Sequence, residues 1–233
     1  MDNAEKYKYR FILASQSPRR KELLGHLSIQ FETISLDVDE SSNESLPESV
    51  VMDVVAKKVE GAINHIANDI KQNGAQMSVV GQNRLPCLLC TDTLVAIDNQ
   101  ILGKPKDKQQ SEKMLKTLSG KTHQVYTSVG LAWCLNIDKI DDPNSWEMKY
   151  FFDKALVKFS EIDAVTLSRY IETGEGLDKA GSYGIQGPAL AFIESLEGSY
   201  STVMGLPLSK VLEALKALPF SVHKGENWRE LFD

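Results

Sequence analysis

The sequence predicts an α/β fold in which helices flank a mixed, twisted β-sheet. Apolar runs typical of buried strands alternate along the chain with segments of helical spacing. Two strong strand patterns, residues 122–135 and 150–160, lie on either side of the turn-forming segment 140–145, which favours an antiparallel hairpin. A chain of 233 residues is long enough for one large domain or two small lobes around a real core.

The first elements are a strand, a helix and a second strand. Residues 10–15, RFILAS, form an apolar run bounded by polar residues, which predicts a buried strand. Ser17 then suits the N-cap of a helix and Pro18 its first position. Leucines at helical spacing follow, and Gly25 marks an early end. Residues 29–36 alternate between apolar and polar side chains, as in a half-buried strand.

The middle and end of the chain continue the alternation. An acidic loop at 37–49 precedes a helical run at 50–70, and the hydrophilic stretch 71–86 reads as a loop or insertion. The other predicted elements are a strand at 85–98, a turn at 98–100, a short strand ending at Pro105, helices at 111–120, 161–174 and 206–218, and a strand with its turn at 191–200. The residues after 218 form a polar tail.

Composition excludes several classes of protein. The formal net charge of −6 disfavours a dedicated nucleic-acid binder. No run of about 18 apolar residues is present, so we expect no membrane span, and the charged first ten residues precede no signal-type apolar run. Three cysteines are too few for a disulfide framework, and Cys87 and Cys90 are better explained as buried strand residues than as metal ligands. We therefore expect a reducing, cytoplasmic location.

A polar corner follows the first strand, where Ser15, Ser17, Arg19 and Arg20 lie together. A helix N-terminus presents unpaired N–H groups and a partial positive charge, which suit an anion. Arginines in that first turn add fork-shaped donors for phosphate oxygens. The positive end of a helix disfavours cations, so a helix with only a structural role is not expected to carry arginines there. The alternative interpretation is a pair of solvated arginines beside an ordinary N-cap.

Two acidic residues and a lysine suggest a second charged group. Asp92 interrupts an apolar strand, so its carboxylate must be paired, bind a metal or lie at the strand's mouth. Glu40 follows another strand, and two such carboxylates suit Mg²⁺ or Mn²⁺. Lys104 is placed to reach an oxyanion. A hydrogen-bonded structural aspartate, a wet acidic loop and a surface lysine are the alternatives.

The glycine-rich segment 178–187, DKAGSYGIQG, suggests close approach of the backbone to a ligand. Gln186 carries a donor and an acceptor that suit a base edge, although a tight connection with positive φ values explains the glycines equally well. The chain contains no GxSxG elbow, Walker loop or HExxH spacing, so neither a serine hydrolase nor a P-loop enzyme is indicated.

Five ordered blocks of the sequence resemble the Maf family of nucleotide pyrophosphatases. They are LASQSPRRKELL (13–24), TDTLVAIDNQILGKP (91–105), MLKTLSGKTHQVYTSV (114–129), YIETGEGLDKAGSYGIQG (170–187) and GSYSTVMGLPL (198–208). Their order is more specific than any one short motif, and the resemblance extends from about residue 11 to about residue 218. It implies one domain over 1–233, with a core at 11–218 and a tail at 219–233.

The resemblance implies hydrolysis of a nucleoside triphosphate to the monophosphate and pyrophosphate with a divalent metal. It also implies a fold similar to that of inosine-triphosphate pyrophosphatases, with two lobes around a cleft. The SPRR and GIQG segments resemble the branch that acts on dTTP and UTP. Removal of non-standard triphosphates from the pool, with modified pyrimidine triphosphates among the substrates, and a link to septum formation are further expectations from the family. A homodimer is common for enzymes of this size.

The implied site has a phosphate side and a carboxylate side. On the phosphate side we assign substrate binding to Ser15, Ser17, Arg19, Arg20 and Thr93. Asp92 is expected to activate the attacking water and to share a divalent metal with Glu40, while Lys104 stabilises developing charge.

Two further positions complete the implied site. Gln186 is expected to hold the pyrimidine edge. The family's helix lysine falls on Lys57 or Lys58, of which we assign Lys58 to substrate binding. The competing function is a non-catalytic nucleotide-binding regulator of cell division.

Overall fold

The protein is described by a computed structural model that covers residues 9–73 and 84–218. Its centre is a seven-stranded sheet with the order β2-β1-β3-β5-β6-β7, in which β4 pairs with β3 beside this path. The strands are β1 (Tyr9–Ala14), β2 (Phe31–Ile34), β3 (Leu85–Ile97), β4 (Gln100–Leu102), β5 (Thr122–Cys134), β6 (Trp146–Phe159) and β7 (Ile193–Glu197).

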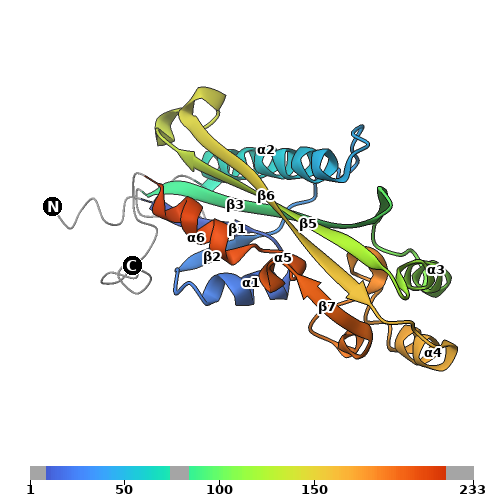
Figure 1. The fold of residues 1–233 in the computed structure, drawn as a ribbon. Coiled ribbons are helices and arrows are strands. Elements are labelled where there is room, and N and C mark those ends of the chain that lie inside the picture. Colours follow the sequence, from blue (N-terminus) through green and yellow to red (C-terminus); the bar gives the residue numbers. More distant parts are fainter. Residues whose placement is uncertain (1–8, 74–83, 219–233) are drawn as a thin grey trace.

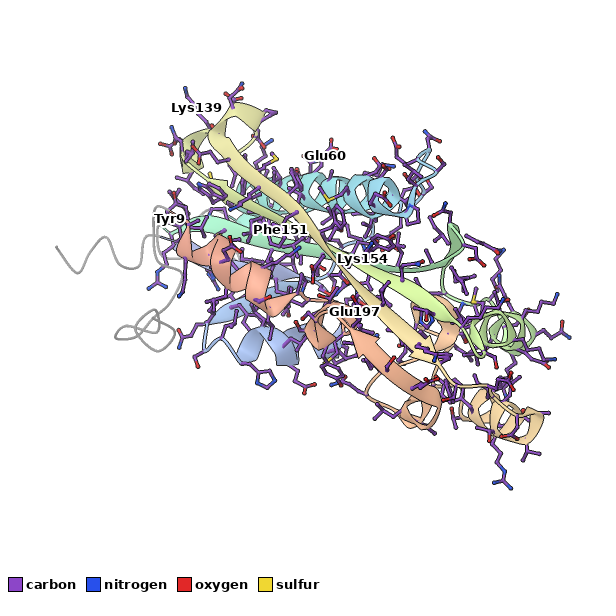
Figure 2. The ribbon with its side chains drawn as sticks, viewed as in Figure 1. Tyr9, Glu60, Lys139, Phe151, Lys154 and Glu197 are labelled. Carbon is purple, nitrogen blue, oxygen red and sulfur yellow. The ribbon has the colours of Figure 1, made fainter. Side chains whose placement is uncertain are left out.

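The sheet is mixed, as the sequence predicts. Strand β1 pairs in parallel with β2 and β3, whereas every other pairing is antiparallel. The predicted hairpin is confirmed: β5 and β6 pair from Thr122↔Lys158 to Cys134↔Trp146. Figure 2 shows side chains of β6, among them Phe151 and Lys154, along the long strand that joins the two ends of the molecule.

Helices cover both faces of this sheet (Figure 1). Helix α2 packs across β3, β5 and β6, and α1 and α6 lie on the opposite side, while α3 and α4 sit together at the far end. The helices are α1 (Pro18–Gly25), α2 (Pro47–Asn73), α3 (Lys108–Leu118), α4 (Ala164–Thr173), α5 (Tyr200–Val203) and α6 (Leu208–Lys216). None of the described helices combines the length and apolar character that crossing a membrane requires.

The helix boundaries mostly follow the predicted caps. Helix α1 begins after Ser17 and ends at Gly25, as predicted. Helix α2 runs to residue 73, so the predicted loop at 71–86 was wrong over its first three residues. The prediction was also wrong at the other end of the loop, because β3 begins at Leu85. A polar sequence does not end a helix that its preceding turns already propagate. The rest of that loop, 74–83, and the predicted tail at 219–233 lie outside the described residues.

Most of the core falls into two large hydrophobic clusters, beside a small third cluster of Val51, Leu94, Ala96 and Tyr126. The larger cluster joins β1, α1, α2 and α6 to the first half of β3. The second gathers around α3 and α4 and includes Val95 and Leu102, from the last part of β3 and from β4. This arrangement agrees with the expected two lobes, and the long strands β3 and β5 run from one lobe into the other.

The open segment of β3, residues 90–94, lies between the two lobes. On one edge of β3, β1 pairs with residues 85–89 and β4 pairs with residues 95–97. On the other edge β5 pairs continuously from Cys87 to Ala96. Among the described residues, no strand therefore covers the first edge at the open segment. Helix α1 begins shortly after β1 ends, so its N-terminus lies beside this gap.

Candidate active site

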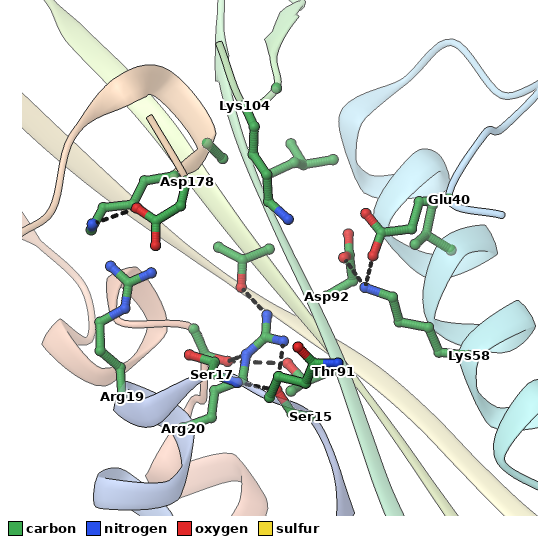
Figure 3. Close-up of a pocket in the computed structure, with 18 of the residues that line it drawn as sticks. Ser15, Ser17, Arg19, Arg20, Glu40, Lys58, Thr91, Asp92, Lys104 and Asp178 are labelled. Atoms are coloured by element: carbon green, nitrogen blue, oxygen red, sulfur yellow. Dashed lines mark hydrogen bonds and ion pairs between the residues drawn. The ribbon is translucent and has the colours of Figure 1, made fainter. Parts of the chain in front are cut away.

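A cavity of about 1220 Å³ opens at the gap in the sheet (Figure 3). The end of β1, the start of α1, the loop before α2, the open segment of β3 and residues 178–185 all contribute to its wall. The predicted site residues in its lining are Ser15, Ser17, Arg19, Arg20, Glu40, Lys58, Asp92, Thr93 and Lys104. The two first-turn arginines and the Asp92 carboxylate thus share one groove.

Two carboxylates meet at one lysine on the α2 side of this cavity. The Nζ atom of Lys58 lies 2.6 Å from Oδ1 of Asp92 and 2.7 Å from Oε1 of Glu40. Partial burial acts to raise the pKa of Glu40, but the hydrogen bond and charge of Lys58, with Lys104 and Arg20, lower it overall. The three side chains therefore form a charged cluster with one surplus negative charge, which Lys58 holds together.

The geometry distinguishes the two lysines that the sequence left open. The ammonium group of Lys57 lies 2.8 Å from Asp53 and 2.6 Å from the carbonyl oxygen of Ser41, away from the carboxylate pair. Successive residues of a helix point about 100° apart, so only one of the two can face the sheet. Lys58 is that residue, since its ammonium group contacts Asp92 and Glu40, while its match to the family's helix lysine stays a prediction.

The two first-turn arginines have different surroundings. Arg20 donates from Nε to the carbonyl oxygen of Gly205 at 3.0 Å, and from its terminal nitrogens to Ser15 and Thr93. Burial lowers the pKa of Arg20, while Asp92 and Glu40 act in the opposite direction. Arg19 points instead toward the side of the pocket that Asp178 occupies (Figure 3), and its charge helps to lower the pKa of Asp178.

The serines of the corner do not cap the helix through their side chains. Ser17 has the extended backbone of an N-cap but makes no side-chain cap hydrogen bond. Its backbone N–H donates to Oγ of Ser15 at 3.2 Å. Pro18 has no N–H, and no side chain of the described residues caps the first turn of α1, so the backbone N–H groups of Arg19 and Arg20 stay available to an anion at the pocket wall.

Lys104 projects into the cavity from the loop after β4 (Figure 3). The structure does not bring Gln186 into the lining: its side chain is exposed, and the glycine-rich segment contributes Asp178, Lys179, Tyr183 and Ile185 instead. The assignment of Gln186 to a base edge remains a prediction.

Sequence reasoning assigned no site role to the turn at Gly205, which it would treat mainly as a structural turn into the last helix. Its φ of +101° suits glycine, and its carbonyl oxygen accepts hydrogen bonds from both Arg20 and the hydroxyl of Thr91. A Cβ atom on Gly205 would lie 3.1 Å from Oγ1 of Thr93. The signal was available, since this glycine lies in the last of the five matching blocks.

The carboxylate pair fits a divalent cation by its chemistry. Lys58 uses one oxygen each of Asp92 and Glu40, which leaves a second oxygen on each carboxylate. Over residues 9–73 and 84–218, no three or more His, Cys, Asp or Glu side chains are grouped as metal ligands. Mg²⁺ commonly takes only one or two carboxylates and completes its shell with water and substrate phosphates, so two carboxylates are sufficient.

Comparison with known proteins finds one matching family and several similar proteins. The model of the family described as Maf-like protein matches residues 10–218, a range that includes every helix and nearly every strand residue of the described fold. Proteins named dTTP/UTP pyrophosphatase from Thermoanaerobacter sp. (strain X514), Bacillus pumilus and Agathobacter rectalis are 36%, 40% and 38% identical to this chain. The alignments cover 89%, 90% and 91% of this chain and 95%, 98% and 98% of the relatives.

Proposed function

We propose, because the chain belongs to the family of Maf-like proteins, that it is a pyrophosphatase that hydrolyses dTTP and UTP to the monophosphate and pyrophosphate. One observation of the structure carries the proposal. A carboxylate cluster at Asp92 faces the N-terminus of α1 and its two arginines across a single cavity. The cavity is large enough for a small-molecule ligand. It places cationic groups that suit phosphate oxygens across from carboxylates that suit a divalent metal.

The chemistry requires a water molecule to attack the α-phosphorus. A new bond forms from the water oxygen to the α-phosphorus, and the bond from that phosphorus to the α–β bridging oxygen breaks, so pyrophosphate leaves. Asp92 orients the water and accepts its proton, since its carboxylate lies in the cavity and is held in place by Lys58. Lys104 and the first turn of α1 stabilise the charge that develops on the leaving pyrophosphate.

Asp92 and Glu40 are the residues that would hold a Mg²⁺ or Mn²⁺ ion in this proposal. Such an ion supplies charge neutralisation for the triphosphate. The support is the pair of free carboxylate oxygens beside Lys58, on the side of the cavity opposite the arginines.

The base end of the nucleotide is assigned to the apolar part of the cavity. Val95, Val125 and Tyr183 belong to its lining, and Gln186 follows Tyr183 in the glycine-rich segment. Aliphatic and aromatic side chains of this kind suit a pyrimidine ring. In this proposal Gln186 contacts the base edge after a movement of its segment.

The proposal includes a cellular setting. Three free cysteines are in keeping with a reducing compartment, so we place the enzyme in the cytoplasm, where it acts on free nucleotides rather than on nucleic acid. Removal of modified pyrimidine triphosphates, a link to septum formation and assembly as a homodimer are proposed on the family resemblance alone.

The test is release of pyrophosphate from a panel of nucleoside triphosphates with Mg²⁺ or Mn²⁺. We expect the highest kcat/KM for dTTP and UTP, and no pyrophosphate when the metal is chelated. Tight binding of dTTP without any pyrophosphate release would instead support a non-catalytic nucleotide-binding regulator. Release from purine triphosphates alone would overturn the assigned substrates.

A further inference from the structure

A chain of hydroxyl groups leads away from Arg20 into the protein interior. One terminal nitrogen of Arg20 donates to Oγ1 of Thr93 at 3.1 Å. Thr93 faces Thr127 across β3 and β5, and their Oγ1 atoms are 2.9 Å apart. Thr127 in turn donates to the carbonyl oxygen of Thr202 at 2.7 Å.

The protons of this series of hydrogen bonds have one consistent arrangement. A threonine hydroxyl carries a single proton, and Thr127 uses its proton on the carbonyl oxygen of Thr202, which can only accept. Thr93 must therefore donate to Thr127, and the remaining acceptor capacity of Thr93 receives the N–H of Arg20. Each hydroxyl accepts one hydrogen bond and donates one, in the direction from Arg20 to Thr202.

The end of this hydrogen-bond series that is far from Arg20 is anchored at the surface. The hydroxyl of Thr202 donates to Asp153 at 2.5 Å, and Asp153 forms an ion pair with Lys210 of α6 at 2.7 Å. Helix α5, which carries Thr202, is thus linked to α6 through Asp153, and the turn after it is held to the guanidinium group of Arg20 through Gly205.

This anchoring sets the direction in which Arg20 presents its free donors. A guanidinium group has five N–H donors. Gly205, Ser15 and Thr93 accept three of them, and the other two have no acceptor in the part of the chain that the structure describes. Since Arg20 lines the cavity, these two N–H groups are the ones available to a phosphate.

We propose that Thr127 is a positioning residue that holds Arg20 in its triphosphate-binding orientation through Thr93. The inference rests on the proposed function, because it takes a nucleoside triphosphate as the ligand of the cavity. Thr127 itself is fully buried and does not line the cavity, so it acts on a ligand only through the hydrogen-bond chain. Removal of its hydroxyl leaves the Thr93 proton without its acceptor and frees Thr93 and Arg20 to rotate together.

The test variant is Thr127→Val, which keeps the branched shape and removes the hydroxyl. Arg20 contacts the phosphates in the ground state and in the transition state alike, so its loss of order weakens both. We expect the KM for dTTP to rise about tenfold and kcat to stay within about twofold. Thr127→Ser, which restores the hydroxyl, is expected to recover the wild-type KM.

A second arm separates positioning from general loosening of the structure. In an Arg20→Ala background, Thr127→Val should raise KM no further, because the residue through which it acts is gone. An equal rise in both backgrounds would overturn the proposal. The matched control is Trp146→Phe, which removes another buried hydrogen bond, from the indole N–H to the carbonyl oxygen of Ile140, at the distant hairpin tip. It should lower the unfolding temperature and leave KM unchanged.

A binding measurement keeps the inference separate from the proposed activity. The Kd of an α,β-imido analogue of dTTP, measured by calorimetry with Mg²⁺, should rise about tenfold in Thr127→Val and return in Thr127→Ser. This readout needs no hydrolysis, so a wild-type protein that binds but does not turn over would defeat the proposed enzyme and still test Thr127. If Thr127→Val does not fold, Thr127→Ala takes its place. An unchanged Kd in the folded variant overturns the proposal.

Discussion

The closed segment of β3, residues 85–89, and the open segment, residues 90–94, belong to one strand and share β5 as a neighbour, yet they differ in what lies on their other edge and in their polar side chains. The closed segment has β1 on its other edge and is buried and apolar along its length. No strand of the described residues pairs with that edge of the open segment, which carries the carboxylate of Asp92.

The difference between the two segments shows where in a sheet a polar site can form. Successive side chains of a strand point to opposite faces. In the open segment Asp92 contacts Lys58 of α2 on one face, while Thr91 and Thr93 contact Gly205 and Arg20 on the other. In a closed segment a neighbouring strand separates these two groups of side chains. At an open edge a ligand can contact both, so the cationic and the acidic parts of the site can bind the same polyphosphate.

The comparison is tested most strongly at Asp92. We expect Asp92→Asn to lower kcat for dTTP by at least about 100-fold, because the amide neither accepts the water proton nor holds a divalent cation as a carboxylate does. In free energy this is about 3 kcal/mol or more on the barrier. Pyrophosphate release measures it, and circular dichroism checks the fold. A folded Asp92→Asn with near-normal kcat would remove Asp92 from the chemistry.

The matched control for that change lies in the closed segment. Leu88 is fully buried there, and Leu88→Ala should reduce the free energy of unfolding by about 2–5 kcal/mol through the cavity that it leaves. Its kcat should remain close to that of the wild type below the unfolding transition. If both variants lose stability and activity alike, the functional difference between the two segments is not real.

The same contrast explains what the sequence could predict. Asp92 was identified because a carboxylate inside an apolar run is a signal along the chain itself, and the Ser17–Pro18 cap located α1 in the same way. The choice between Lys57 and Lys58 depends on which face of α2 packs on β3, and no local pattern records that. The Gly205 carbonyl became part of the site only through its contacts with Arg20 and Thr91.

The two large hydrophobic clusters also differ, and acid should reveal the difference. The second cluster is packed against a buried histidine, His123, whose Nε2 lies 2.8 Å from the hydroxyl of Tyr183 and whose ring packs edge-on against Phe159. Burial lowers the pKa of His123 from 6.5 to about 4. Its Nδ1 atom has no hydrogen-bond partner among the described residues.

The sign of the expected effect follows from that pKa. The unfolded chain binds a proton at His123 below about pH 6.5, whereas the folded protein does so only near pH 4. Stability from this group is therefore complete above pH 6.5 and is lost as the pH falls toward 4, by about 3 kcal/mol in total. Urea unfolding at a series of pH values measures it.

The control is His123→Phe, which cannot take up a proton. Carboxylates contribute to acid unfolding in both proteins, so the informative quantity is the difference between their free energies of unfolding. That difference should change between pH 6.5 and pH 4 in favour of the variant. A difference that stays constant over this interval would show that His123 is not buried as a neutral side chain in solution.

The smallest expected effect comes from the lysine next to the site. Lys57 forms an i,i+4 ion pair with Asp53 at the surface, and such pairs contribute about 0.5 kcal/mol or less. Lys57→Ala should therefore change stability by no more than that and kcat by less than about twofold. Lys58→Ala leaves the Asp92 and Glu40 carboxylates facing each other without a cation, and we expect kcat/KM to fall by about 10- to 100-fold. Because the two lysines are adjacent on one helix, helix propensity and overall charge change equally in the two variants. Equal kinetic losses in the two variants would mean that the face of α2 that carries Lys58 does not face the open segment of β3. A loss confined to Lys58→Ala instead ties activity to the carboxylates at the open edge.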